Sequence, residues 1–126
     1  MLRIEIPADP IPLSRPRFSR GRAYLPSRSA KYRAVIQAAV KEQLSDSFLP
    51  FEGELHCRLK FYRKFNPSSR RFGDIDNHVK ACLDATQGLL FIDDSQVVSI
   101  TAEKFQDKLN PRTVFEIKKA SQPHDR

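Results

Sequence analysis

The sequence predicts a single small α/β domain in which a mixed β-sheet is packed against two helices. The length of 126 residues suits one domain with one modest core. A content of 40% hydrophobic and 29% charged residues is typical of a globular chain. Segments with strand periodicity and segments with helix periodicity follow one another in the order β-α-β-α-β-β, which indicates a mixed sheet with packed helices. We expect the domain to span residues 1–119 and a polar tail to occupy residues 120–126.

The first strand is predicted over Leu2–Ile6, where apolar and polar residues alternate before Pro7. Residues 11–33 contain serines, prolines and seven basic residues but no acid, so they predict a basic loop with a short extended piece at 22–25. The first helix is predicted to begin near Ser27 or Ser29, either of which suits an N-cap, and to end before residue 50. Its apolar positions follow the spacing of one helix face: Tyr32, Val35, Ile36, Ala39, Val40 and Leu44.

The second half predicts three strands and one helix. Residues 54–62 alternate strictly and predict a strand with one buried face, and the basic loop 63–73 follows. A helix is predicted over Asn77–Gln87, with Val79, Cys82 and Leu83 inward and a glycine near its end. Residues 96–105 and 113–118 predict two strands that a turn at 107–112 would join as a hairpin.

Several classes of protein are excluded by simple counts. No apolar run is long enough to cross a bilayer, and the alternating first residues do not resemble a signal peptide, so we expect a cytoplasmic protein. Cys57 and Cys82 are predicted to be small buried residues, and no histidine pairs with them at zinc spacing. His78 is expected to be a surface helix residue. The absence of a glycine-rich phosphate loop argues against a nucleotide cofactor.

Charge is distributed unevenly along the chain. The net charge is +7, yet residues 1–73 hold 15 basic and 6 acidic side chains, while residues 74–94 hold five aspartates and a single lysine. A basic protein with a compact acidic segment indicates a polyanionic partner around a cation site.

The acidic segment contains two pairs of aspartates, Asp74 with Asp76 and Asp93 with Asp94. In an extended segment, residues i and i+2 point the same way, so Asp74 and Asp76 are expected to direct both carboxylates to one point. Clustered carboxylates repel one another unless a cation binds them, and oxygen ligands suit Mg²⁺ or Mn²⁺. Lys80 lies one helical turn after Asp76, where it would stabilise charge on a phosphate or position a water.

Structural interpretations of the same residues remain open. Asp74 or Asp76 would then cap a helix, Asp93 and Asp94 would lie in a solvated turn, and Lys80 would form an ordinary ion pair with the residue four positions before it. A calcium-sensor loop is excluded because the required glycine and glutamate are missing from their positions.

The same residues resemble the RusA-type Holliday junction resolvases. The resemblance covers roughly residues 3–119 and rests on a basic proline-rich motif and on an acidic set that is specific in order and spacing. The residues that carry it are Pro10-Ile11-Pro12, Arg15-Pro16-Arg17-Phe18, Asp74-Ile75-Asp76-Asn77, Lys80, Asp84-Ala85 and Asp93-Asp94-Ser95-Gln96-Val97-Val98.

This resemblance implies a homodimeric, Mg²⁺-dependent endonuclease that makes paired, symmetric nicks in four-way DNA junctions during recombination and repair, often encoded by a prophage. It implies that Asp74, Asp76 and Asp94 are catalytic metal ligands, that Asp93 is an adjacent carboxylate, and that Lys80 is the essential lysine. Two departures from the family pattern concern DNA handling and the preferred cleavage site. Leu13 replaces a common lysine, and two residues separate Arg71 from Asp74.

The predicted DNA contacts are the basic residues of the two loops and of the first helix. As backbone contacts they would make binding dependent on salt and largely independent of sequence. They are Arg15, Arg17, Arg20, Arg22, Lys31, Arg33, Lys64, Arg70 and Arg71. Phe18 and Tyr24 are either base-stacking residues or core residues.

A C2 dimer fits two symmetric nicks, and the apolar residues of the second helix and of Phe91–Ile92 are the expected interface. Two other functions compete with the nuclease. One is a non-catalytic DNA-binding module in which the aspartates are caps and turns. The other is a nucleotidyltransferase-like enzyme, although the glycine–serine motif of that family is missing.

Overall fold

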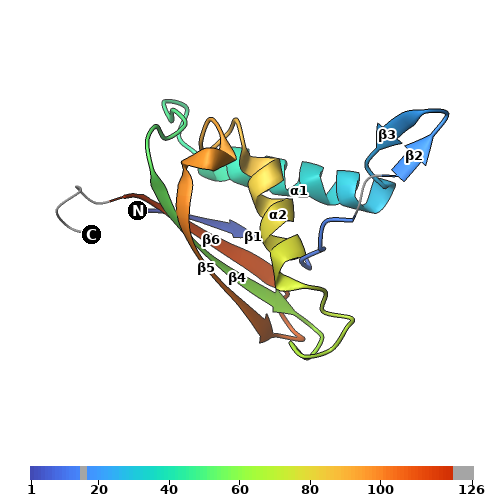
Figure 1. Cartoon of the computed structure of the whole chain (residues 1–126). Coiled ribbons are helices and arrows are strands. Elements are labelled where there is room, and N and C mark those ends of the chain that lie inside the picture. Colours follow the sequence, from blue (N-terminus) through green and yellow to red (C-terminus); the bar gives the residue numbers. More distant parts are fainter. Residues whose placement is uncertain (15–16, 121–126) are drawn as a thin grey trace.

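The computed structural model describes residues 1–14 and 17–120, except for the side chain of Arg17. A four-stranded mixed sheet lies at its centre, with two helices on one of its faces (Figure 1). The predicted α/β class and the β-α-β-α-β-β order of this main body are confirmed. The sheet strands are β1 (Leu2–Ile6), β4 (Leu55–Arg63), β5 (Val97–Gln106) and β6 (Arg112–Lys119), and their order across the sheet is β1-β6-β4-β5.

Strand β4 lies between β5 and β6, which follow one another in the chain. It pairs antiparallel with β6, so that Leu59 opposes Phe115, and parallel with β5, so that Leu59 also opposes Ala102. The prediction that residues 96–105 and 113–118 form a hairpin is therefore wrong. The turn does reverse the chain, but β4 carries the most regular apolar row and takes the place between the two strands.

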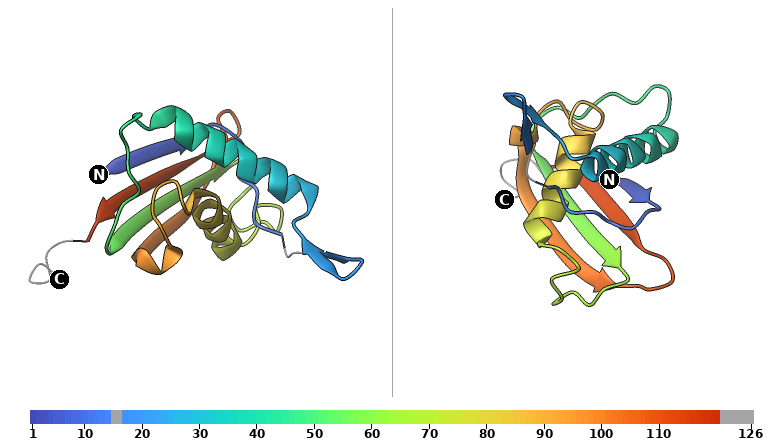
Figure 2. Two further views of the ribbon diagram at one scale, coloured as in Figure 1. Left: turned by 90° about the horizontal axis from the view of Figure 1, so that it is seen from above. Right: turned by 90° about the vertical axis from the view of Figure 1, so that its right-hand side faces the viewer.

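Helices α1 (Ser27–Gln43) and α2 (Ile75–Thr86) cover one face of the sheet (Figure 2). The core lies between these layers and includes Ile4, Ile36, Leu59 and Phe115. Val35 belongs to the predicted apolar face of α1 but is exposed, because the helix contacts the sheet on a narrower stripe than its sequence predicts.

A hairpin of β2 (Arg17–Ser19) and β3 (Arg22–Tyr24) extends beyond the first turn of α1 (Figure 1). The sequence predicted only a short extended piece here. Arg20 and Gly21 both have positive φ angles, which is the backbone that a tight two-residue hairpin turn requires. Phe18, at 77% exposure, and the exposed Tyr24 are not core residues, which removes the structural alternative for both aromatic side chains.

Three local predictions have clear outcomes. Cys57 and Cys82 are buried as predicted, and burial raises the pKa of their thiols to about 11 and about 12. The residue before α1 is Pro26, so neither predicted serine caps the helix, and Ser29 Oγ instead accepts a hydrogen bond from the Ser14 backbone N–H. No helix in the described part of the chain is long and apolar enough to cross a membrane.

The remaining elements agree closely with their predicted bounds. Helix α2 begins two residues before the predicted start and ends one residue before the predicted end. The predicted tail falls mostly on residues 121–126, which lie outside the described residues.

Candidate active site and nucleic-acid interface

The loop that leads into α2 is held by a buried guanidinium. Arg63 Nη2 lies 3.1 Å from Asp9 Oδ2, and Arg63 Nη1 donates to the Phe72 carbonyl at 2.7 Å and to the Arg71 carbonyl at 3.0 Å. A buried cation with a carboxylate and two carbonyls has its donors satisfied. The end of loop 63–73 is therefore tied both to β4 and to the N-terminal segment.

His78, which lies on α2, contacts the same loop. Its ring lies between Phe61 and Phe72, and its Nε2 lies 2.7 Å from the carbonyl that Arg63 also contacts. A carbonyl only accepts, so Nε2 carries the proton in this contact. The prediction of a surface histidine is wrong: the side chain is buried, and burial lowers its pKa to about 4. The strand residue Phe61 and the loop residue Phe72 enclose it, which helix periodicity does not reveal.

Gly73 brings the proline-rich segment against the start of α2. Its φ is +90°, and a Cβ atom there would lie 2.8 Å from Pro12 Cγ. The Leu13 backbone N–H donates to the Asn77 carbonyl at 3.0 Å. The two motifs of the sequence, 60 residues apart, thus meet at the first turn of α2 because glycine leaves the space they need.

Asp74 and Asp76 lie at this first turn and are both exposed. Asp74 occupies the N-cap position, yet its side chain makes no capping hydrogen bond. Asp76 already lies within α2, so the prediction that an extended i, i+2 spacing aligns the two carboxylates is wrong. Asp74 ends the loop and Asp76 lies in the first turn of α2, so both residues are at the same end of the helix. The two carboxylates lie at the positive end of the helix dipole.

Lys80 follows Asp76 by one helical turn and is exposed. Neither Asp76 nor Asp84, one turn away on either side, lies within ion-pair distance of it, and the described chain offers no other ion pair to its ammonium. The open alternative of an ordinary ion pair therefore has no support from the structure.

Asp93 and Asp94 lie beyond the other end of α2, before β5. Asp93 caps a short 3₁₀ turn, η1 (Asp94–Gln96), by accepting a hydrogen bond from the Ser95 N–H. The Ser95 side chain and then this N–H lower the pKa of the Asp93 carboxyl. Gln96 Oε1 accepts from the Ile92 and Asp93 N–H groups at 2.8 and 2.9 Å. Asp94 is exposed, and the Asp94 backbone N–H donates to Gln87 Oε1. Gln96 thus holds the turn that carries Asp94, a contact that its sequence position alone does not reveal.

The two aspartate pairs lie at opposite ends of α2. A helix of 12 residues is about 18 Å long, which is too far for carboxylates at its two ends to share one cation. In the described part of the chain, no three histidine, cysteine, aspartate or glutamate side chains converge as a metal site. One copy of the chain therefore does not assemble the predicted set of Asp74, Asp76, Asp93 and Asp94.

A basic hollow of about 310 Å³ borders the Asp74 end of α2. Gly73 and Pro12 form part of its wall, and Lys64, Arg70 and Arg71, three of the predicted DNA contacts, line it. Arg28, from the first turn of α1, joins them. Arg28 lies within the predicted basic loop, and its place beside Arg70 and Arg71 is a tertiary contact that the sequence does not reveal.

The other predicted DNA contacts extend from this hollow along the N-terminal segment. Arg20 and Arg22 are exposed on the hairpin, and Lys31 and Arg33 are exposed on α1. Arg15 lies outside the described residues, and only the backbone of Arg17 is described.

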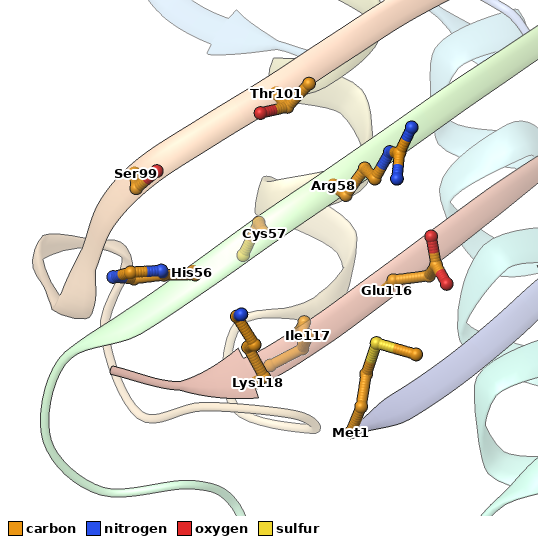
Figure 3. Close-up of a pocket in the computed structure, with 9 residues that line it drawn as sticks. All are labelled: Met1, His56, Cys57, Arg58, Ser99, Thr101, Glu116, Ile117 and Lys118. Carbon is orange, nitrogen blue, oxygen red and sulfur yellow. The ribbon is translucent and has the colours of Figure 1, made fainter. Parts of the chain in front are cut away.

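A larger hollow, of about 380 Å³, lies on the sheet face opposite the helices (Figure 3). His56, Arg58 and Lys118 point into it from β4 and β6, together with Glu116. None of the aspartates discussed above lines this hollow. It is therefore not the expected site of the metal chemistry, although it is larger than the basic hollow.

Comparison with known proteins gives a match that covers most of the chain. The family described as endodeoxyribonuclease RusA matches residues 7–118. No curated protein matches the chain. The matched range includes the proline-rich segment, the basic hollow and both ends of α2. The chain therefore belongs to the RusA family of Holliday junction endodeoxyribonucleases, which are hydrolytic nucleases.

Proposed function

We propose that this protein acts as a Mg²⁺-dependent homodimer that resolves four-way DNA junctions by paired, symmetric nicks. The observation that carries the proposal is the position of Asp74 and Asp76 beside the basic hollow. Asp74 makes no capping hydrogen bond, Asp76 Oδ1 accepts from the adjacent Asn77 N–H, and both carboxylates are exposed. Gly73, the residue before Asp74, lines the hollow together with Arg28, Lys64, Arg70 and Arg71. A phosphodiester held by the cations would present its phosphorus to the carboxylate end.

The basic side chains bind and orient the substrate in this proposal. Arg28, Lys64, Arg70 and Arg71 surround one concave surface, so several phosphates of a bent backbone reach them together. The hairpin and α1 extend this surface through Arg20, Arg22, Lys31 and Arg33. Phe18, at the hairpin, is available to stack on an unpaired base at the branch point.

Lys80 supplies positive charge next to the reacting phosphate. Its ammonium has no ion pair in the described chain and lies one turn from Asp76. Negative charge increases on the phosphate oxygens during hydrolysis, so a nearby ammonium stabilises the transition state more than the ground state.

Asp74 and Asp76 would hold Mg²⁺, or Mn²⁺ in its place, with water and phosphate oxygens completing the ligands. Mg²⁺ commonly binds through one or two carboxylates and a substrate phosphate, so this pair fits the ion. When bound, the ion activates a water and offsets charge on the leaving oxygen. Without it, the two carboxylates would repel the phosphate.

The test is cleavage of a synthetic four-way junction and a matched linear duplex, with Mg²⁺ or with EDTA. We expect paired nicks in the junction only, dependent on Mg²⁺, and a loss of at least about 100-fold in rate in Asp76→Asn. Glu116→Gln removes a carboxylate on the sheet face opposite the helices, in a hollow that none of the site aspartates lines, and is the matched control, expected to cut like the wild type.

The outcomes separate the competing functions. Binding without cutting in Mg²⁺ and in Mn²⁺ would leave a DNA-binding module. Equal cutting of both substrates would leave a nuclease without junction selectivity. Transfer of a nucleotide to DNA in place of hydrolysis would support the nucleotidyltransferase-like alternative.

The role of the basic hollow is tested separately by the salt dependence of junction binding. Each lost phosphate contact is expected to reduce the slope of log K against log salt by about 0.9. Arg71→Ala should show this change, whereas Lys108→Ala, in the β5–β6 turn, should not. Identical slopes in the two variants would exclude the hollow from the interface.

A further inference from the structure

Two aromatic side chains lie on the sheet face that the helices leave uncovered. Several phenylalanines belong to the core, and Phe91, expected from the sequence at a dimer interface, is one of them and is fully buried. Tyr62 and Phe105 are only partly buried. Successive residues of a strand point to opposite faces of a sheet, and Phe61 belongs to the core, so Tyr62 lies on the face opposite the helices. Phe105 opposes Tyr62 in the register of β4 with β5 and shares this face.

Tyr62 is the middle member of a row of flat groups that crosses three strands. Its ring stacks on Phe105 of β5, with 4.9 Å between the ring centroids and 18° between the ring planes. The guanidinium carbon of Arg112, on β6, lies 3.9 Å from the centroid of the Tyr62 ring. Because β5 and β6 flank β4 on opposite sides, the phenyl ring and the guanidinium cover opposite faces of Tyr62.

The two ends of this row differ. At the inner end, Arg112 Nη1 lies 2.9 Å from Asp107 Oδ2, and Arg112 Nε lies 3.6 Å from Glu5 Oε1, so the guanidinium is held in place. At the outer end, Phe105 lies on β5, which is an edge strand of the sheet (Figure 1). Within the described residues, Phe105 contacts no ring other than Tyr62 and no cation. Its outer side is therefore available to one further planar group.

The charges around the row favour a nucleotide as that group. Lys60 and Lys64, two residues before and two residues after Tyr62, form no ion pair in the part of the chain that the structure describes. The neighbouring carboxylates of Glu103 and Asp107 each have an arginine partner. In a nucleotide, the base stacks on an aromatic ring while the phosphate is attracted to nearby ammonium groups.

The row also adjoins the basic hollow of the proposed active site. Strands β4 and β5 run parallel, so both end at the edge of the sheet where loop 63–73 begins (Figure 1). Lys64 lines the hollow, and its carbonyl accepts a hydrogen bond from the side chain of Gln106 at 3.0 Å. Gln106 is the residue after Phe105. A DNA strand whose phosphate is bound at Lys64 thus has a neighbouring base within reach of the Phe105 ring.

We propose that the outer face of Phe105 binds one unpaired base of the DNA, as the fourth member of the row formed by Arg112, Tyr62 and Phe105, while Lys64 binds an adjoining phosphate. This inference rests on the proposed function, because it assigns a further contact to the same substrate. Aromatic side chains on an open sheet face are a recurrent platform for unpaired bases. A linear duplex has no unpaired base along its length, so this contact favours branched or single-stranded DNA.

Binding of a short thymidine oligonucleotide and of a linear duplex, both in EDTA to prevent cutting, tests the proposal. Phe105→Leu keeps an apolar side chain on β5 but removes the ring. It should weaken binding of the single strand about tenfold and leave binding of the duplex unchanged, which also shows that the variant is folded. Phe105→Tyr should bind both DNAs like the wild type, because it restores a ring.

The matched control is Phe48→Leu. Phe48 is also partly buried and packs edge-on against Phe51, but it lies beside the start of β1 and the end of β6, away from loop 63–73. This variant should bind the single strand and the duplex like the wild type. Equal weakening in Phe48→Leu and Phe105→Leu, or no weakening in Phe105→Leu, would overturn the proposal.

Photochemical cross-linking locates the base. A 5-iodouracil placed in the oligonucleotide becomes joined on irradiation to an aromatic ring on which it stacks, and mass spectrometry of the peptides identifies that ring. The cross-link should lie at Phe105 and should be lost in Phe105→Leu. A cross-link confined to Phe18 or Tyr24 of the hairpin, and retained in Phe105→Leu, would refute a base site on the sheet.

Neither measurement depends on catalysis, so this proposal and the proposed function fail separately. A wild type that cuts no DNA, yet loses single-strand affinity and the cross-link in Phe105→Leu, would refute the nuclease function and support the base site. A wild type that resolves junctions, with single-strand affinity unchanged in Phe105→Leu, would refute the base site alone.

Discussion

The two ends of α2 are built in different ways. At its start, the loop that carries Asp74 is held by the buried Arg63, by His78 and by the close approach of Pro12 to Gly73. At its end, the turn that carries Asp94 is held by its Asp93 and Asp94 N–H groups, which donate to Gln96 Oε1 and Gln87 Oε1 at the surface. The first end is anchored in the core, and the second is anchored by exposed amides.

This difference indicates which end of α2 costs more free energy to move. Buried, fully paired groups are costly to move, whereas exposed hydrogen bonds exchange readily with water. The Asp74 end is therefore expected to be the more costly of the two to move, and the Asp94 end the more adjustable.

The largest expected effect is from Asp9→Ala at the fixed end. It leaves the buried Arg63 guanidinium without its carboxylate, and this change should cost about 3 kcal/mol of folding free energy, at the low end for a broken buried pair because the Asp9 side chain is 37% exposed. Urea denaturation measures it. The control is Glu103→Ala, whose pair with Arg58 is exposed and should cost less than about 1 kcal/mol. Equal losses of folding free energy in the two variants would show that burial of Arg63 does not strengthen its pair with Asp9.

Acid should weaken the fixed end through His78. Its pKa is lowered to about 4 in the folded protein by burial, so the unfolded chain takes up the proton first as the pH falls below about 6.5. Stability from this group is complete above pH 6.5 and is lost towards pH 4, by about 3 kcal/mol.

The measurement is the free energy of unfolding of the wild type and of His78→Gln at pH 7 and at pH 4. The wild type should lose about 3 kcal/mol more than the variant, because glutamine does not titrate. If the free energies of unfolding of the two proteins differed by the same amount at pH 7 and at pH 4, the pKa of His78 would not be lowered in the folded protein.

Gly73→Ala should have a smaller effect at the same end. The new Cβ meets Pro12 Cγ at 2.8 Å and the positive φ opposes any side chain, so a loss of about 2 kcal/mol is expected. Thermal unfolding checks it. Gly53→Ala, also at positive φ but with nothing within 4 Å of its Cβ, separates the backbone cost from the clash. It should lose about half as much.

The smallest expected effect on stability is at the adjustable end. Gln96→Ala removes its hydrogen bonds to Ile92 and Asp93 and to the carbonyls of Phe51 and Gly53, at a cost of about 1 kcal/mol because the groups return to water. Hydrogen exchange should speed up at the Ile92 and Asp93 amides and stay unchanged at the first turn of α2. Faster exchange at both ends would contradict their independence.

Hydrophobic periodicity predicted much of the fold. The alternation in β4 and the stripe in α1 predicted their elements to within a few residues, because each pattern follows from which side of one element faces the core. The pairing of β4 between β5 and β6 was not predictable in this way. An alternating strand buries the same face whichever neighbour it has.

For the site, the sequence alone determined the family. It also predicted which aspartates, which lysine and which arginines form the site, and these roles stay predictions. Only the tertiary structure decided their arrangement. It buried His78, brought Arg28 to the loop of Arg70 and Arg71, and placed the two aspartate pairs at opposite ends of α2. Spacing along a chain records neighbours within one element, whereas distances between elements arise from packing across the core.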